Sequence, residues 1–177
     1  MKCLLSDNKG FTLVEVLVAI PLVVLLLSGI FNVLSVAVTS YQMSNGRMAV
    51  QQTARFAVDN IVRELQFVQG GAITLNSANE IEFVTNRNGV NETVIYSDAI
   101  NNSDGTVQLM RNNVPITGDN ITSVSISNLV FAPVNASNPT PTYPLTTNIV
   151  SITLTAEATN VINNPHYTVE TTVATVR

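Results

Sequence analysis

The sequence predicts an α+β fold in which one long amino-terminal helix packs on an antiparallel β-sheet. Three observations lead to this prediction. An apolar run of helical length fills residues 11–38, and an amphipathic pattern with three- and four-residue spacing follows it. Beyond Gly71 the spacing of the apolar residues changes to two, as in strands. One helix followed by a series of strands is typical of the α+β class.

Length and charge restrict the possible classes of protein. With 177 residues, the chain is long enough for one globular domain and an appendage. Both lysines precede Phe11, and six arginines stand against eleven acidic residues from Phe11 onward, a net side-chain charge of −5. The arginines are scattered and form no basic patch of the kind that binds nucleic acid. The sequence therefore gives no support to a nucleic-acid partner.

Single copies of cysteine and histidine limit the chemistry that the chain offers. Cys3 is the only cysteine, so neither an intramolecular disulfide nor a cysteine metal site is possible. His166 is the only histidine, and it lies between Asn-Pro and Tyr-Thr-Val, where we expect it to begin an exposed strand. A catalytic role for His166 is disfavoured. We predict no catalytic residue, no metal ligand and no cofactor.

Three interpretations compete for the amino-terminal run. A secretory signal peptide has an apolar region of about 7–15 residues, whereas the run here exceeds 20 residues. A plain membrane anchor needs about 20 apolar residues, and Val16–Val38 supplies 23. This interpretation leaves Glu15 unexplained, because it is the only charged side chain between Phe11 and Val38. An ionised carboxylate in the middle of a bilayer costs about 2.5–3.5 kcal/mol on insertion scales.

The third interpretation accounts for the carboxylate. The stretch Lys9-Gly10-Phe11-Thr12-Leu13-Val14-Glu15, followed by the apolar run, resembles the class III signal of type IV pilins and pseudopilins. The resemblance implies that a membrane aspartyl peptidase cuts between Gly10 and Phe11 and methylates the new amine of Phe11. Removal of the leader, residues 1–10, would leave 167 of the 177 residues. Residues 11–38 would then form the transmembrane and filament-core helix.

The resemblance also implies a role for Glu15. In a growing filament, the Phe11 amine of an entering subunit needs a partner inside an apolar bundle, and Glu15 of a neighbouring subunit would supply it. An unpaired buried charge is costly, and a buried polar pair selects one register. One departure from the family pattern is the position of the helix proline. Pro21 comes early in the run, and we expect a kink there.

Residues 39–71 are expected to form the amphipathic half of the same helix. Apolar residues recur there at three- and four-residue steps and define one buried stripe, namely Val50, Ala54, Ala57, Ile61, Leu65 and Val68. Gly46 marks a possible bend between the two halves. We expect the pair Gly70-Gly71 to end the helix.

Residues 72–177 are expected to form an antiparallel β domain, a meander that a proline-rich loop, residues 132–144, interrupts. Asn88-Gly89 is a typical hairpin turn. The predicted strands are residues 80–84, 93–96, 106–111, 121–131, 149–158 and 167–176.

The leading functional hypothesis is a structural subunit, a minor pilin or pseudopilin, of a type IV pilus or a related secretion or DNA-uptake filament. The resemblance implies the pilin fold and three kinds of partner: other subunits, the prepilin peptidase and an inner-membrane assembly platform. Weak patterns in the strand order favour the J or W type. The alternative is a membrane-anchored enzyme or binding protein with an extracytoplasmic β domain. Glu80 and Glu82 give it little support, because we expect them at a solvated edge.

Overall fold

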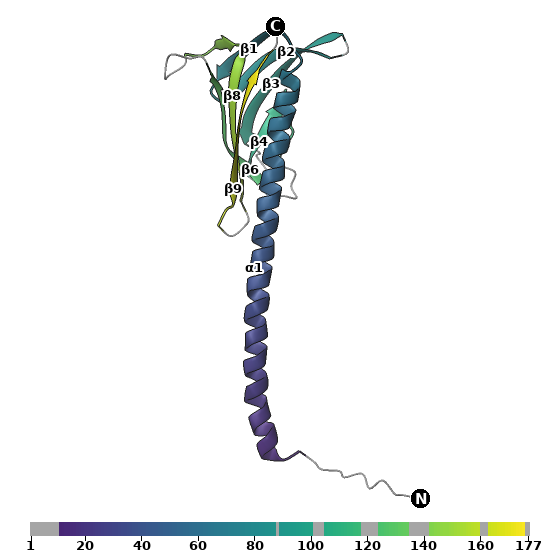
Figure 1. Ribbon diagram of the computed structural model, residues 1–177, viewed down its shortest axis with the longest axis vertical. Coiled ribbons are helices and arrows are strands. Elements are labelled where there is room, and N and C mark those ends of the chain that lie inside the picture. The colour runs from purple at the N-terminus through teal and green to yellow at the C-terminus, as the bar shows by residue number, and fades with distance from the viewer. Residues whose placement is uncertain are drawn as a thin grey trace, which may run out of the picture. The chain divides into compact units, whose positions relative to one another are not determined.

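The fold comprises one helix and nine strands, as seen in a computed structural model that describes residues 11–175 except 88, 101–104, 118–123, 135–141 and 160–162 (Figure 1). The long helix packs against antiparallel sheets, which confirms the α+β prediction. The chain divides into two compact units, Met1–Tyr41 and Gln42–Arg177. The first unit contains the apolar part of the helix, and the second contains the rest of the helix and all the strands.

Helix α1 (Leu13–Leu65) is continuous over 53 residues. It runs through Pro21, whose missing N–H removes one backbone hydrogen bond without ending the helix. It also runs through Gly46, which is buried, so the chain does not leave the helix at the bend that the sequence suggested. A buried glycine marks a place where the helix backbone itself is covered by neighbouring atoms.

The predicted end of the helix at Gly70-Gly71 is wrong. The last turn closes with bonds from the Gln66 and Phe67 N–H groups to carbonyls of the preceding turn, and β1 (Val68–Ser77) begins immediately afterwards. Gly70 and Gly71 lie inside β1 with φ angles of 69° and 67°. The β1 register shifts between Val68 and Ile73, so the two glycines form a bulge, a conformation that suits residues without a side chain.

Sheet A contains six strands in the order β5-β4-β3-β2-β1-β7, all antiparallel to their neighbours. The hairpin that joins β2 to β3 places Gly89 at its turn with φ of 80°, as the Asn88-Gly89 prediction requires. The further strands of sheet A are β2 (Glu80–Arg87), β3 (Val90–Ile100), β4 (Val107–Arg111), β5 (Val114–Pro115) and β7 (Leu145–Thr147).

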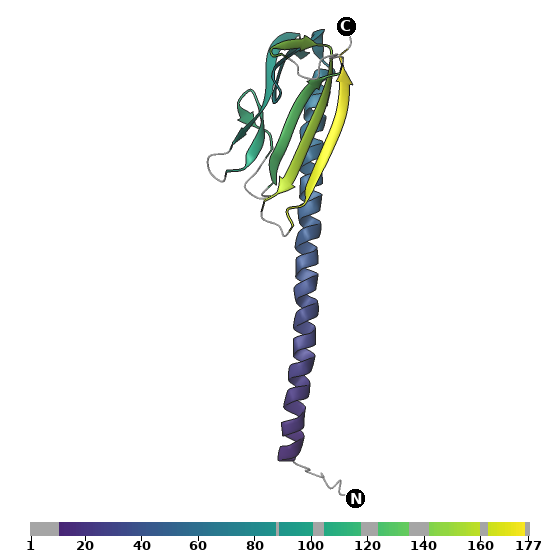
Figure 2. The ribbon, with the colours of Figure 1, turned by 90° about the vertical axis from the view of Figure 1, so that its left-hand side faces the viewer.

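Sheet B is a separate three-stranded sheet in the order β6-β8-β9 (Figure 2). Its strands are β6 (Val124–Pro133), β8 (Ile149–Ala158) and β9 (His166–Ala174). The predicted closing pair is confirmed, because β8 and β9 pair without a register shift over their full length. His166 begins β9 and is exposed, as expected. The single predicted meander is wrong, since the strands divide between two sheets.

The core lies between the helix and the two sheets. The predicted stripe on α1 is confirmed: its five helical members are buried, and Val68 continues it in β1. Sheet A contributes Ile73, Phe83 and Val94, and sheet B contributes Phe131 and Leu154, all at most 2% exposed. The amphipathic half of α1 is therefore an integral part of the globular unit.

Two further predictions for the β region need correction. The proline-rich loop begins later than predicted, because β6 continues to Pro133, and part of the loop lies outside the described residues. Glu80 and Glu82 do not lie at an edge, since β2 pairs with strands on both sides. The Asn76 amide donates to Glu80 Oε1 at 2.9 Å and to Glu82 Oε2 at 3.0 Å, which offsets their mutual repulsion.

Candidate functional site

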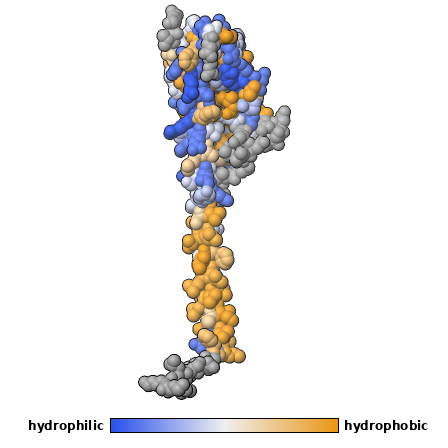
Figure 3. All heavy atoms as spheres, turned by 90° about the vertical axis from the view of Figure 1, so that its right-hand side faces the viewer, coloured by the Kyte–Doolittle hydropathy of each residue, from blue (hydrophilic) through white to orange (hydrophobic). Residues whose placement is uncertain are grey.

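The amino-terminal half of α1 presents an apolar surface without a partner in the described chain. Every residue from Phe11 to Val38 is exposed, and the surface of this segment is almost uniformly apolar (Figure 3). By length and composition, α1 is able to cross a membrane, and it lies near the amino terminus of the chain. Such a surface is stable in lipid or against other apolar helices, and not in water.

Two polar side chains of this segment, and a third just after it, bond to the backbone of their own helix. Ser28 Oγ donates to the Leu25 carbonyl at 2.8 Å, and Asn32 Nδ2 donates to the Ser28 carbonyl at 3.0 Å. Thr39 repeats the pattern with the Ser35 carbonyl at 2.9 Å. These bonds reduce the cost of placing hydroxyl and amide groups in lipid. None of them involves the carboxylate of Glu15.

Glu15 and Thr12 together cap the start of the helix. The Glu15 N–H donates to Thr12 Oγ1 at 3.3 Å, and the Thr12 N–H points at Glu15 Oε2 at 3.5 Å. This reciprocal arrangement is a capping box, and its signature Thr-x-x-Glu is present in the sequence. The spacing of Thr12 and Glu15 is local, so the sequence alone would have been enough to indicate this cap. The carboxylate therefore has a role in the single chain as well as the expected role between chains.

A hollow lies beside Glu15 on the apolar helix. Ala19 is small, and the space next to it, about 430 Å³, is bordered by Phe11, Glu15, Val16 and the two valines one turn further on. Phe11 itself is 84% exposed. An apolar group from outside the chain would fit next to the carboxylate. Gly10 and the rest of the predicted leader lie outside the described residues.

A second cluster of charges joins the carboxyl end of α1 to sheet A. Arg111 Nε donates to Glu64 Oε1 at 3.0 Å, and its Nη2 donates to Glu92 Oε1 at 3.1 Å. The Tyr96 hydroxyl donates to Glu64 Oε2 at 3.0 Å. Burial and the neighbouring Glu64 carboxylate raise the pKa of Tyr96, so its hydroxyl stays protonated at neutral pH. This cluster holds the helix against the sheet.

The described residues contain no group of three or more His, Cys, Asp or Glu side chains that could hold a metal ion. The cluster around Arg111 has two carboxylates, but both bond to the arginine.

Comparison with known proteins adds one finding. Residues 5–31 match the family model of the prokaryotic N-terminal methylation motif. Comparison with curated proteins found no match, and comparison with solved structures found none either. The matched segment contains Gly10, Phe11 and Glu15 and the first part of α1. The chain thus carries the class III prepilin signal, consistent with a type IV pilin-like protein.

Proposed function

We propose that this protein is a structural subunit, a minor pilin or pseudopilin, of a type IV pilus or of a related secretion or DNA-uptake filament. In this proposal a prepilin peptidase cleaves the chain between Gly10 and Phe11 and methylates the Phe11 amine. The mature subunit then assembles through the amino-terminal half of α1.

The observation that carries the proposal is the methylation motif at residues 5–31 on a helix with an exposed apolar surface. A motif at the start of a buried helix would have no surface to offer a partner. Here the segment from Phe11 to Val38 is exposed throughout. Lipid would cover it before assembly, and the helices of neighbouring subunits would cover it in the filament.

Glu15 supplies the specificity of assembly. Cleavage creates a cationic amine on Phe11, which would be costly to bury without a counter-charge. The Glu15 carboxylate of a neighbouring subunit provides that counter-charge, and the hollow beside Ala19 accommodates part of the entering chain. In the unassembled chain the same carboxylate bonds to its own Thr12 at a long 3.5 Å. This weak bond leaves the carboxylate available for a stronger, charge-assisted one.

The motif and the apolar helix fit a precursor with a single membrane span in the inner membrane. Lys2 and Lys9 precede the span, which favours a cytoplasmic leader and an extracytoplasmic β domain. The partners in this proposal are other subunits, the prepilin peptidase, an inner-membrane assembly platform and, before assembly, membrane lipid.

Mass spectrometry of the chain recovered from membranes and from sheared filaments tests the proposal. We expect a chain of 167 residues that begins with N-methylated Phe11. An intact amino terminus in both fractions, or a cut near Ala37, would show that the segment is an ordinary anchor or signal peptide.

A further inference from the structure

One edge of sheet B is open. Its last strand, β9, pairs with β8 on one side and with no strand on the other (Figure 2). At the start of β9 the Ala158 N–H donates to the Pro165 carbonyl at 3.0 Å, and the pairing continues without a register shift. Bonds between antiparallel strands involve every second residue, so the residues between them direct their N–H and C=O groups away from β8. These outward-facing residues are His166, Thr168, Glu170, Thr172 and Ala174, and none of their backbone groups bonds to another described residue.

The other edges of the two sheets are protected. In sheet A, β5 has two residues and includes Pro115, and β7 has three residues. In sheet B, β6 contains a register shift and Pro133, and its Phe131 N–H donates to the Ala78 carbonyl at 2.7 Å. Short strands, prolines, bulges and covering loops keep edges from pairing with other chains. Strand β9 has nine residues without a proline, a lysine or a register shift, so the described sheets leave this one long edge free to pair.

The apolar layer of sheet B is incomplete at the same edge. Tyr167, Val169 and Thr171 lie on the core side of β9 and are only half-buried, whereas their partners on β8 are fully buried. The difference arises because β8 has a strand on both sides and β9 has a strand on one side only. A further strand next to β9 would cover this flank and remove the three side chains from water.

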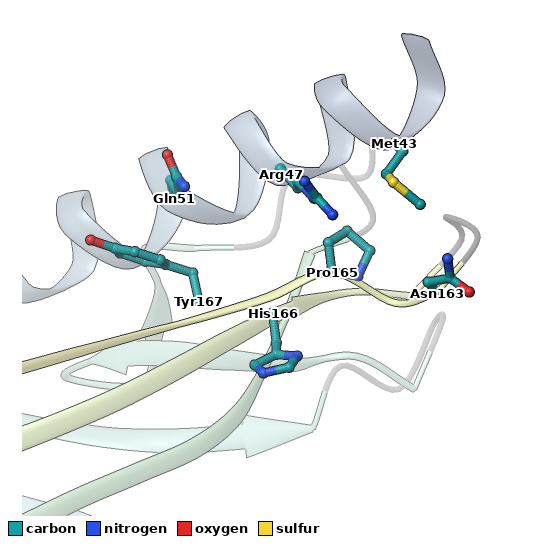
Figure 4. Close-up of a pocket in the computed structure, with 7 residues that line it drawn as sticks. All are labelled: Met43, Arg47, Gln51, Asn163, Pro165, His166 and Tyr167. Carbon is teal, nitrogen blue, oxygen red and sulfur yellow. The ribbon is translucent and has the colours of Figure 1, made fainter. Parts of the chain in front are cut away.

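A groove gives such a strand room at the start of β9. It encloses about 310 Å³ between α1 and the strand. Met43, Arg47 and Gln51 line it from the helix, and Tyr167 faces them, whereas His166 turns away (Figure 4). Alternate side chains of an added strand would point in the same two directions, towards α1 and towards solvent.

Glu170 decides which kind of chain fits the edge. It is the only acidic residue of β9, and the strand has no lysine or arginine. If the β9 strands of two copies paired symmetrically, the register that uses all nine residues would place Glu170 opposite Glu170. Like charges directly opposite each other destabilise a sheet, and a shifted register would shorten the pairing. A second copy of this chain is therefore a poor partner, and a strand with a basic residue at that position is a good one.

We infer that the outer edge of β9 binds an extended segment of a different chain, which adds a strand to sheet B and places a lysine or arginine opposite Glu170. The backbone bonds supply affinity, the charge pair fixes the register, and apolar side chains on the core side cover Val169 and its neighbours. Such a contact joins two unlike chains and does not repeat from copy to copy, which suits a minor subunit. That the partner is another filament subunit rests on the proposed function.

Photo-cross-linking of the full chain, in the cells that produce it, tests this contact. A photoreactive residue replaces either Thr168 or Thr172, which flank Glu170 in the outward-facing row. We expect both positions to cross-link to one segment of one other chain, at sites about four residues apart with a lysine or arginine between them. Val130 lies in the same row as Glu170 but on the far strand β6, and as the control position it should give no such product.

Substitutions at Thr172 test the role of the backbone. Thr172→Pro removes an N–H that faces away from β8, so sheet B should be retained and the cross-link from Thr168 should fall roughly tenfold. Thr172→Ala keeps the N–H and should stay within about twofold of wild type. Thr171→Pro is the control for folding, because it removes an N–H that faces β8, and its unfolding midpoint should lie well below that of Thr172→Pro.

A second variant covers the case in which Thr172→Pro folds poorly. Glu170→Lys changes only a side chain on the solvent side, and it should lower the cross-link from Thr168 roughly fivefold, the upper limit for an exposed ion pair.

Several outcomes would overturn the inference. Neither position of β9 cross-links, the sites on the partner are scattered, or the product joins two copies of this chain or two parts of one copy. A cross-link of wild-type yield in a folded Thr172→Pro chain, or in Glu170→Lys, would also show that no strand is added at this edge.

The processing of the chain separates this inference from the proposed function. The expected cross-link in a chain that keeps its leader would support the contact and contradict the filament role. Processed chains in filaments that give no cross-link from β9 would support the filament role and overturn the contact.

Discussion

The two halves of α1 belong to one continuous helix and have opposite surroundings. Between Phe11 and Val38 every residue is exposed, whereas from Gly46 to Leu65 one stripe of the helix is buried against the sheets. The apolar residues of the first half are continuous, and those of the second recur with helical spacing. The second half therefore packs within the chain, whereas the exposed apolar surface of the first half requires lipid or another chain to cover it.

The largest effect is expected from a change at the proposed cleavage site. Gly10→Ala should leave the apolar half of α1 in the membrane with its leader attached, because a side chain obstructs the peptidase at the scissile bond. Full-length precursor would accumulate, and filament would be lost. Mass spectrometry of the membrane fraction measures this. Normal maturation of Gly10→Ala would show that the cut lies elsewhere. Thr12→Ser, which leaves the Gly10–Phe11 bond unchanged, is the control and should be processed like wild type.

Deletion of the apolar half separates the two regions of the helix. A fragment of residues 42–177 should fold, since the buried stripe of α1 and both sheets lie within it. It should be monomeric at micromolar concentration and unfold in one cooperative transition. Circular dichroism with urea and analytical ultracentrifugation measure this. An aggregated fragment that regains structure only with residues 11–41 would contradict the independence of the second half.

Much of this contrast could be predicted from the sequence. The apolar run, the stripe that begins at Val50 and the β8–β9 hairpin follow from local spacing, which the residues themselves determine. The end of the helix could not be predicted in this way. Gly70-Gly71 is equally suited to a helix terminus and to a β-bulge, and the pairing of β1 with β2 and β7 decides between them. The division into two sheets likewise depends on contacts between distant segments.

The residues of the candidate site also divide into those that local spacing predicts and those that only the fold brings together. Gly10, Phe11 and Glu15 lie close together in the sequence, so a local motif indicates them. The capping box of Thr12 with Glu15 could also be predicted, from its spacing alone. The cluster of Glu64, Arg111, Glu92 and Tyr96 could not be predicted, because its members are up to 47 residues apart and meet only in the fold.

Removal of the arginine from that cluster should weaken the second half without affecting the first. Arg111→Ala leaves Glu64 partly buried without its counter-charge. The loss of unfolding free energy should be about 2 kcal/mol, below the 3–5 kcal/mol of a fully buried pair, because the two side chains remain 26% and 20% exposed. Urea unfolding of the 42–177 fragment measures it, and Arg63→Ala, at an exposed position, should cost less than about 0.5 kcal/mol. Equal losses in both variants would rule out a special role for the cluster.

A smaller effect is expected from the tyrosine of the same cluster. The pKa of Tyr96 is raised in the folded chain above the value of about 10 for an exposed tyrosine. Its contribution to stability is therefore complete below pH 10 and is lost as the pH rises through the folded-state pKa. Tyr96→Phe should cost about 1 kcal/mol at pH 8, and the difference from wild type should shrink as the pH is raised above 10. A difference that stays constant with pH would assign the effect to packing instead of to the protonated hydroxyl.

Assembly of a Glu15→Leu variant tests whether the apolar half of α1 binds neighbouring subunits through this carboxylate. Membrane insertion should be intact, because an insertion cost of about 2.5–3.5 kcal/mol is removed. Cleavage should persist, because the Gly10–Phe11 bond is unchanged, and Glu15→Asp should be intermediate. We predict a processed chain that begins with Phe11, remains in the membrane fraction and is absent from sheared filaments. A Glu15→Leu chain that enters filaments as well as wild type would show that Glu15 is not the assembly contact.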